Sequence, residues 1–251
     1  GIFGLPRIKQ IIEKIIYNDL YPTIDLNMSD SNAGARTNRN IRDHLFIVYG
    51  VINSVIKDKK APIDAHIYDI KQCFDKLDLK DTLNELWEVG IQTDYLALLY
   101  ELNKLINIAV KTPVGETERK PITEIVAQGG IFGGIKCSNV IDTIGRECLK
   151  TGENLYTYKN CVSIPPLAFV DDLFFMSECG TKSLIGNAYI NTKIEMKNLE
   201  FGIDEEKNEA KKCKQIHIGK ENALCPPLKA HHANINKVSD DKSVSYTHLT
   251  L

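Results

Sequence analysis

The chain has 251 residues, 43% of them hydrophobic and 25% charged, which is ordinary for a globular protein with a sizeable core. No apolar run is long enough to span a bilayer and no secretory signal begins the chain, which argues against a membrane protein or a secreted one. The seven irregularly spaced cysteines contain no CxxC pair, which favours a reducing compartment, the cytoplasm or the nucleus. The net charge of −2 does not by itself indicate a nucleic-acid binder, so contact with a phosphate backbone would depend on local basic patches and bound cations.

In the first half of the chain, apolar residues at helical spacing predict helices over 7–17, 39–59, 81–89 and 94–108. Residues 18–38 are polar and irregular, which predicts a loop. A strand is predicted over 62–70, with Asp69 at its end. Asp81 is the expected N-cap of the third helix, and Gly90 is expected to end it.

The second half begins with two short strands around Gly115 and an amphipathic helix after Gly134. Leu167 to Met176 are apolar except for Asp171 and Asp172, which predicts a β-hairpin with both carboxylates at its tip. A helix over 182–199 and a strand over 215–218 complete the prediction. This irregular alternation favours an α+β fold, a sheet with helices packed on one face.

Both ends of the chain predict an incomplete protein. The sequence starts at Gly1 without an initiating Met, so an N-terminal portion is expected to be missing. The last eight residues, VSYTHLTL over 244–251, resemble the translation of a sequencing-library adaptor. The alternative is a natural polar tail.

The carboxylates indicate metal chemistry. Two like charges at the end of an apolar hairpin are costly unless a cation neutralises them, and oxygen ligands suit Mg²⁺. Asp69, arriving from a separate strand, would complete a site for two divalent ions that clamp an in-line phosphoryl transfer. The alternatives are an ordinary turn at Asp171-Asp172 and a strand-end cap at Asp69.

Four segments, in order, resemble the conserved blocks of reverse transcriptases, and of the non-LTR retrotransposon type in particular. They are the fingers segment Gly34–Asp43, motif A over Tyr68–Asp75, motif B starting at Gln128-Gly129, and motif C over Phe169–Asp172. Motif B departs from the family pattern at Ile131 and Gly133-Gly134, and the fingers segment departs from it at Ala35.

The resemblance implies an RNA-directed DNA polymerase with right-hand fingers and palm, whose antiparallel palm sheet carries a central Asp-Asp hairpin packed against helices. The implied partners are an RNA template, a DNA primer and dNTPs, with two Mg²⁺ ions (or Mn²⁺) and no membrane; no oligomeric state is indicated. The implied division is part of the fingers over 1–60, the palm with motifs A to D and intervening helices over 61–220, and a region leading to a missing thumb over 221–243. Without the thumb, the chain is expected to show little or no processive synthesis.

The resemblance also assigns roles. Asp69, Asp171 and Asp172 are the catalytic metal ligands, Phe74 the steric gate that selects deoxynucleotides, and Gln128-Gly129 the template-side loop. Arg36 and Arg39 are expected to bind phosphates, and Lys212 to protonate pyrophosphate. The alternative for Phe74 is core packing, and for the arginines a solvated helix start. Lys207, Lys211 and Lys214 compete with Lys212 in a lysine-rich loop.

Other functions fit parts of this pattern. An RNA-directed RNA polymerase shares the carboxylates, but usually has Gly where this chain has Val170 and lacks a gate like Phe74. A catalytically dead, nucleic-acid-binding fragment is the other alternative. Finally, Cys213, His217, Cys225 and either His231 or His232 could form a zinc site.

Overall fold

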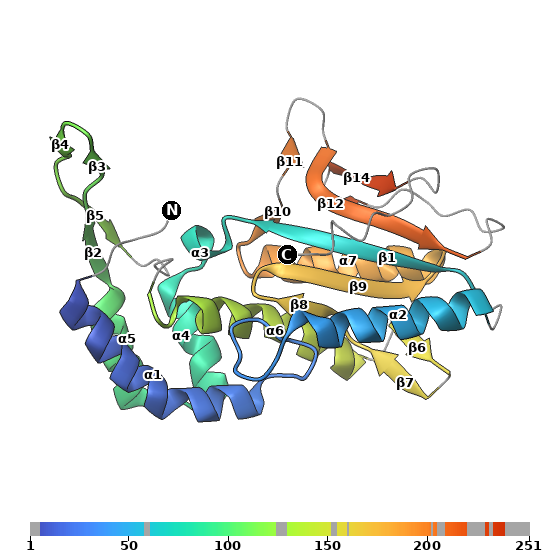
Figure 1. Cartoon of the computed structure of the whole chain (residues 1–251), viewed down its shortest axis with the longest axis horizontal. Helices are drawn as coiled ribbons and strands as arrows, with labels where there is room; N and C mark the ends of the chain where they lie inside the picture. Colours follow the sequence, from blue (N-terminus) through green and yellow to red (C-terminus); the bar gives the residue numbers. More distant parts are fainter. Residues whose placement is uncertain are drawn as a thin grey trace.

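The computed structural model describes residues 6–57, 61–123, 130–151, 155–159, 161–201, 203–204, 209–219, 229–230 and 233–238. Its helices are α1 (Arg7–Asn27), α2 (Ile41–Lys57), α3 (Cys73–Lys76), α4 (Leu79–Glu88), α5 (Thr93–Asn103), α6 (Gly133–Thr151) and α7 (Thr181–Met196). Helices and a central sheet alternate along the chain (Figure 1), which confirms the predicted α+β class. None of the helices in these ranges combines the length and apolar character needed to cross a bilayer.

The central sheet is built around β1. Its strands are β1 (Ile63–Lys71), β8 (Leu167–Phe169), β9 (Asp172–Glu178), β10 (Glu200–Phe201), β11 (Ile203–Asp204), β12 (Glu209–Ile218), β13 (Lys229–Ala230) and β14 (Ala233–Val238). The order is β13-β14-β12-β1-β9-β8, with β10 beside β1 and β11 beside β12. β1 is antiparallel to both β9 and β12, as predicted, whereas β12 and β14 are parallel.

The two faces of β1 are covered by different helices. Ile63 and Ala65 pack with Val51 and Val55 of α2. His66 and Tyr68 point to the opposite face of β1. On that face, Tyr68 packs in a core that includes residues of α6 and α7. Helices therefore cover both faces of the sheet, and not one face as predicted. The apolar stripe of α2 accounts for the difference, because it supplies a partner for the second face.

A second core lies beside the sheet. Residues of α1, α4 and α5 pack with the start of α6 into one apolar cluster, which lies at the lower left of Figure 1. Two helix boundaries here differ from the prediction. α1 continues through Pro22 to Asn27 because Leu20 and Ile24 extend its buried stripe. α4 is capped by Asp78, whose carboxylate accepts from the backbone N–H groups of the following turn, and not by Asp81.

A two-stranded arm leaves this second core. It pairs β2 (Leu105–Ile108) with β5 (Lys120–Thr123), and β3 (Lys111–Thr112) with β4 (Gly115–Glu116). Figure 1 shows the arm projecting from the body of the molecule. The strands around Gly115 were predicted. The helix predicted to reach residue 108 ends at Asn103 instead, because β2 pairs with a strand that the local pattern does not reveal. A further hairpin joins β6 (Tyr156–Tyr158) to β7 (Val162–Ile164).

Candidate active site

Two of the predicted catalytic carboxylates are cross-strand neighbours. In the β1–β9 ladder, Asp69 lies directly opposite Asp172, the first residue of β9. Directly opposed residues of an antiparallel pair have Cβ atoms about 4.5–5.5 Å apart, and like charges there are destabilising. Both side chains are only half-buried. The register therefore brings two acidic groups together at an edge that solvent reaches, an arrangement that a cation would relieve.

Asp171 is held beside this pair by a tight turn. Phe169 of β8 pairs with Asp172 of β9, which leaves a two-residue loop, Val170-Asp171, at the tip of the predicted hairpin. Val170 has a φ of 60°, which is costly for a β-branched residue. The loop is thus a strained turn whose second residue is a carboxylate. All three predicted metal ligands lie at one end of the β8–β9 hairpin and β1.

Three buried cysteines, Cys73, Cys137 and Cys213, lie near the carboxylates. The sulfurs of Cys73, at the start of α3, and Cys137, in α6, lie 2.7 Å apart. The pKa of Cys137 is raised well above its ordinary value by the hydrogen bond with Cys73, by burial, and by the negative charges of Cys73 and Asp171. Burial also raises the pKa of Cys213 on β12 to about 11, against a smaller opposing effect of a backbone hydrogen bond at Asp69. Cys137 and Cys213 are therefore neutral packing groups near the carboxylates.

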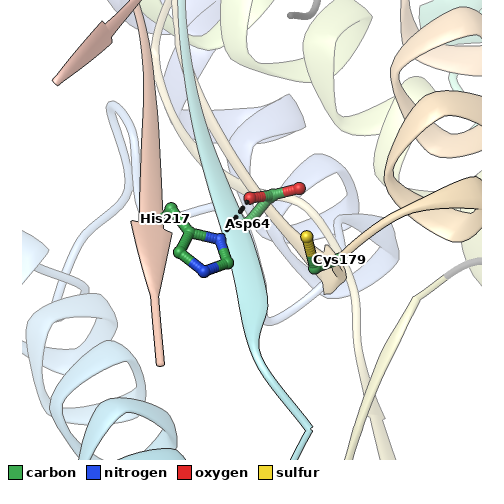
Figure 2. A group of neighbouring side chains, drawn as sticks. All are labelled: Asp64, Cys179 and His217. Atoms are coloured by element: carbon green, nitrogen blue, oxygen red, sulfur yellow. Dashed lines mark hydrogen bonds and ion pairs between the residues drawn. The ribbon is translucent and has the colours of Figure 1, made fainter. Parts of the chain in front are cut away.

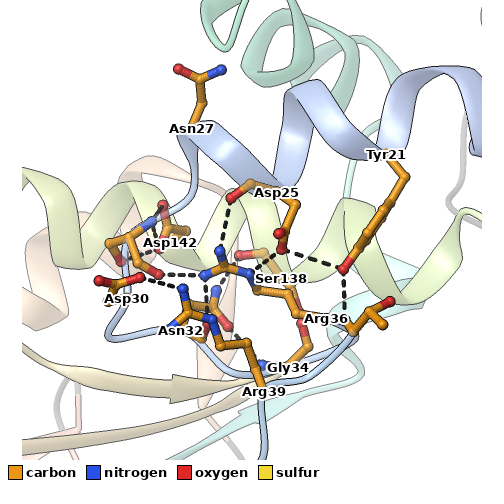
Figure 3. A network of polar contacts seen from close by, with 12 residues as sticks. Tyr21, Asp25, Asn27, Asp30, Asn32, Gly34, Arg36, Arg39, Ser138 and Asp142 are labelled. Atoms are coloured by element: carbon orange, nitrogen blue, oxygen red, sulfur yellow. Dashed lines mark hydrogen bonds and ion pairs between the residues drawn. The ribbon is translucent and has the colours of Figure 1, made fainter.

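The loop between α1 and α2 is docked against the hairpin and α6 (Figure 3). Its Asn32 forms a parallel bridge with Ala168 of β8, and its side-chain amide donates to the Ser138 carbonyl of α6 at 2.7 Å. Ser138 Oγ donates in turn to the Gly34 carbonyl at 2.8 Å. At the start of the loop, the Ser29 amide donates to the Asp142 carboxylate of α6. The loop is therefore held by both the β8–β9 hairpin and α6.

Sequence reasoning missed this network. Its members are single polar residues, and Ser29 and Asp142 are separated by 113 positions. The only local signal is that Ser138 and Asp142 lie four residues apart in α6, on one face of the helix. That face points at the loop.

The two predicted phosphate-binding arginines differ in their surroundings. The Arg36 side chain is 2% exposed, and four of its five donors are used within the protein. It contacts the Asp25 carboxylate and the carbonyls of Asp25, Ser29 and Asn32. Arg39 is 38% exposed and donates to the exposed Asp30 at 2.6 Å. Arg36 holds the loop together, whereas Arg39 is accessible to a ligand.

An open pocket lies between the loop and the hairpin. Its lining includes Ala33, Ala35, Arg39 and Asn40 from the loop and Phe169 from β8. Phe74, the predicted gate, lies within motif A, in α3 directly after β1, and is half-buried against the sheet core. The three carboxylates therefore lie at one end of the β8–β9 hairpin, and Arg39 lines a pocket that borders β8 of the same hairpin.

Several of the other predicted site residues lie outside the part of the chain that the structure describes. Gln128 and Gly129 lie outside the described residues, as do residues 244–251. Lys212 belongs to β12, but its side chain is outside the described part of the chain. Of the zinc alternative, Cys225, His231 and His232 are also outside. Cys213 is in the sheet core and lies four positions along β12 from His217, about 13 Å at the rise of a strand, so these two cannot share one ion.

Comparisons with known proteins identify the fold. The chain matches the family model "Reverse transcriptase (RNA-dependent DNA polymerase)" over residues 5–238. None of the curated proteins matches it significantly.

Among solved structures, it is similar to apo telomerase from Candida tropicalis truncated from its C-terminal domain, with a TM-score of 0.55, 16% identity, and coverage of 89% of this chain and 43% of that one. Telomerase from the same organism with a fragment of telomeric RNA gives a TM-score of 0.54, 15% identity, and coverage of 92% and 38%. Telomerase from Candida albicans, also with a fragment of telomeric RNA, gives a TM-score of 0.50 and 12% identity, with coverage of 89% of this chain and 36% of that one.

The chain spans less than half the length of these structures, and identities this low show a shared fold alone. The family match extends over nearly the whole chain and includes each of the four sequence blocks. The chain therefore belongs to the reverse transcriptase (RNA-dependent DNA polymerase) family.

Proposed function

We propose that this chain forms the fingers and palm of a polymerase that copies RNA into DNA, for the mobility of a non-LTR retrotransposon. The observation that carries the proposal is the register that sets Asp69 opposite Asp172, with Asp171 in the adjoining turn. Family membership supports templated DNA synthesis. The order and spacing of the motifs support the retrotransposon type.

The carboxylates fit a pair of Mg²⁺ ions. Asp69, Asp171 and Asp172 offer only hard oxygen atoms and lie at a half-buried edge, where room remains for water and phosphate oxygens. Bound divalent ions would supply charge stabilisation for the attacking and leaving oxygens of an in-line displacement. Asp69 and Asp171 would hold the ions, and Asp172 would orient the ligands from the adjacent ladder position.

The nucleotide would enter beside the α1–α2 loop. Phe74 follows the strand that carries Asp69, so its ring would lie under the sugar of the incoming nucleotide and select against a 2′-hydroxyl. Arg39 lines the open pocket and is accessible to a triphosphate or a template phosphate. Arg36 supports this role indirectly, because it fixes the shape of the loop that carries Arg39. Lys212 is the proposed proton donor to pyrophosphate, and Gln128-Gly129 the template-side loop.

An RNA template is the expected partner, annealed to a DNA primer. One of the similar telomerase structures holds a fragment of telomeric RNA, and this fold is therefore compatible with an RNA ligand. The net charge of −2 offers little general attraction for nucleic acid, so binding would be weak and sensitive to salt.

Single-nucleotide addition tests the proposal most directly. The chain is incubated at low salt with an RNA template, a DNA primer and one dNTP, with Mg²⁺ or with EDTA. We expect Mg²⁺-dependent addition of a deoxynucleotide, lost in Asp69→Asn and Asp171→Asn and retained in Asp94→Asn, which changes an exposed carboxylate at the start of α5. Addition that survives Asp69→Asn would refute the metal assignment. Preference for a ribonucleotide would indicate an RNA polymerase, and binding without addition a catalytically inactive fragment.

A further inference from the structure

A second group of metal-ligating side chains lies at the other end of β1. Asp64 of β1, His217 of β12 and Cys179, just after β9, place one ligand atom each within 4.8 Å of one another. Figure 2 shows the three side chains gathered around Asp64. Asp64 lies opposite His217 in one ladder and opposite Ser177, two residues before Cys179, in the other. The antiparallel register of three strands therefore assembles the group.

This group is distinct from the catalytic carboxylates. Asp64 and Asp69 are five residues apart on one strand, which is about 17 Å. Because side chains alternate along a strand, the two carboxylates also point to opposite faces of the sheet. A metal bound at Asp64 would not touch the polymerase site, so this inference does not depend on the proposed function.

The Asp64 carboxylate is buried in a way that calls for a further ligand. Its side chain is 0% exposed, and one oxygen accepts from or pairs with His217 Nδ1 at 3.1 Å. The other oxygen, Oδ2, has no hydrogen-bond partner among the described residues, and neither has the buried Oγ of Ser177 opposite. Leaving a buried carboxylate oxygen unsatisfied is costly, and a bound cation would remove that cost.

We propose that Asp64, Cys179 and His217 supply three ligands of a zinc site that joins β1, β12 and the end of β9. One oxygen, one nitrogen and one sulfur are a donor set that Zn²⁺ accepts, whereas the thiolate is unsuited to Mg²⁺ or Ca²⁺. Two ligands of a tetrahedral zinc ion are about 3.3 Å apart, close to the separation of Asp64 Oδ1 and His217 Nδ1. With a carboxylate and a thiolate, the bound ion would be neutralised, as burial requires.

The backbone already positions the third ligand. The Cys179 amide donates to the Pro62 carbonyl at 2.9 Å, which fastens the end of β9 beside the start of β1. The sulfur of Cys179 is disulfide-bonded in this structure, so zinc would bind the reduced chain. A phosphine reduces the disulfide by two electrons, so that the S–S bond breaks and two thiols form. The phosphine is oxidised to a phosphine oxide, whose oxygen comes from water. The Cys179 thiol then releases its proton as its sulfur binds the metal.

Cobalt substitution provides the test, because Co²⁺ in a tetrahedral thiolate site shows a sulfur-to-cobalt charge-transfer band. The purified full chain is reduced with a phosphine and titrated with Co²⁺, then with Zn²⁺ to displace it. We expect the charge-transfer band to saturate at one equivalent bound at this site in the reduced chain and to be absent from the untreated chain. Cys179→Ser should abolish the charge-transfer band, and Asp64→Asn should weaken affinity about tenfold or more.

Two further variants keep the test decisive if a ligand variant fails to fold. Cys161→Ser removes an exposed, free cysteine and should leave the titration unchanged. His217→Cys exchanges one zinc ligand for another and should intensify the charge-transfer band. A band that persists in Cys179→Ser, a band that His217→Cys leaves unchanged, or a reduced chain that shows no band would overturn the proposal. The magnesium-dependent addition assay is read separately, so the outcome for one site does not decide the other.

Discussion

The backbone of Gly34 lies so close to Val170 that a Cβ atom at position 34 would be 2.1 Å from the Val170 nitrogen. Real Cβ atoms are not found at such a distance, and the neighbour here is backbone, which cannot turn aside. Val170 is the strained residue of the turn that carries Asp171, a predicted catalytic residue. The α1–α2 loop therefore supports the position of Asp171, the residue after Val170, by direct contact with the turn.

This contact predicts the effect of Gly34→Ala. The added methyl group must push the loop and the catalytic turn apart, so we expect deoxynucleotide addition to fall by roughly tenfold or more, since small displacements of reacting groups are costly. The free energy of unfolding should fall as well, by about 1–3 kcal/mol, the usual cost of overpacking. Single-nucleotide addition and urea unfolding measure the two effects.

Gly50→Ala is the matched control. Gly50 lies inside α2, and a Cβ there would meet nothing within 4 Å. Replacing a helical glycine by alanine should stabilise the chain by about 0.5–1 kcal/mol. It should leave nucleotide addition unchanged. Equal rates of nucleotide addition in Gly34→Ala and Gly50→Ala would show that the contact of Gly34 with Val170 does not matter for activity.

The sequence predicts the β8–β9 hairpin well because the signals there are local. Apolar runs on both sides of Asp171-Asp172 indicate a hairpin, and the β8–β9 register confirms it. The facing of Asp69 and Asp172 follows only from the pairing of β1 with β9, which no local pattern specifies. The family resemblance predicted an antiparallel palm sheet on which the carboxylates converge, but not this particular pairing.

The polar contacts around the loop were beyond sequence reasoning for the same reason. Arg36 has the residue type of a phosphate ligand, but its use is decided by Asp25 and the carbonyls that surround it. The Asp64 cluster is similar, since its three members lie on three segments more than a hundred positions apart at the extremes. The search for spaced Cys and His residues instead selected Cys213, which the strand places too far from His217.

Phe74→Val tests the steric gate. We expect the ratio of ribonucleotide to deoxynucleotide addition to rise by roughly tenfold or more, because the smaller side chain leaves room for a 2′-hydroxyl. Deoxynucleotide addition should change less. The control is Phe46→Val, since Phe46 is 80% exposed on α2. An unchanged ratio, with lowered stability, would show that Phe74 is a packing residue alone.

Arg36 and Arg39 should separate into a stability effect and a ligand effect. Arg36→Lys keeps the charge but loses the planar fork that serves Asp25 and three carbonyls, so unfolding should become easier by about 2–4 kcal/mol. Arg39→Ala breaks an exposed ion pair, which contributes at most about 1 kcal/mol. It should instead raise the KM for the nucleotide. Urea unfolding and the KM of both variants check the division, and the reverse pattern would contradict it.

Lys136 is expected to make the free energy of unfolding of this chain depend on pH. Its side chain is buried in α6, and burial lowers its pKa to about 8, an effect that Glu13 partly opposes and Lys9 reinforces. In the unfolded chain the pKa of a lysine is about 10.4. Between these values the unfolded chain binds more protons than the folded one, so the free energy of unfolding rises with pH. Below pH 8 both states carry the charge, and the full cost of burying it remains.

Compared with Lys136→Met, which has no titrating group at this position, the parent chain should gain free energy of unfolding by up to about 1.4 kcal/mol per pH unit between pH 8 and pH 10. Urea unfolding of both proteins at intervals over this range measures the difference, and parallel curves would show that Lys136 reaches solvent.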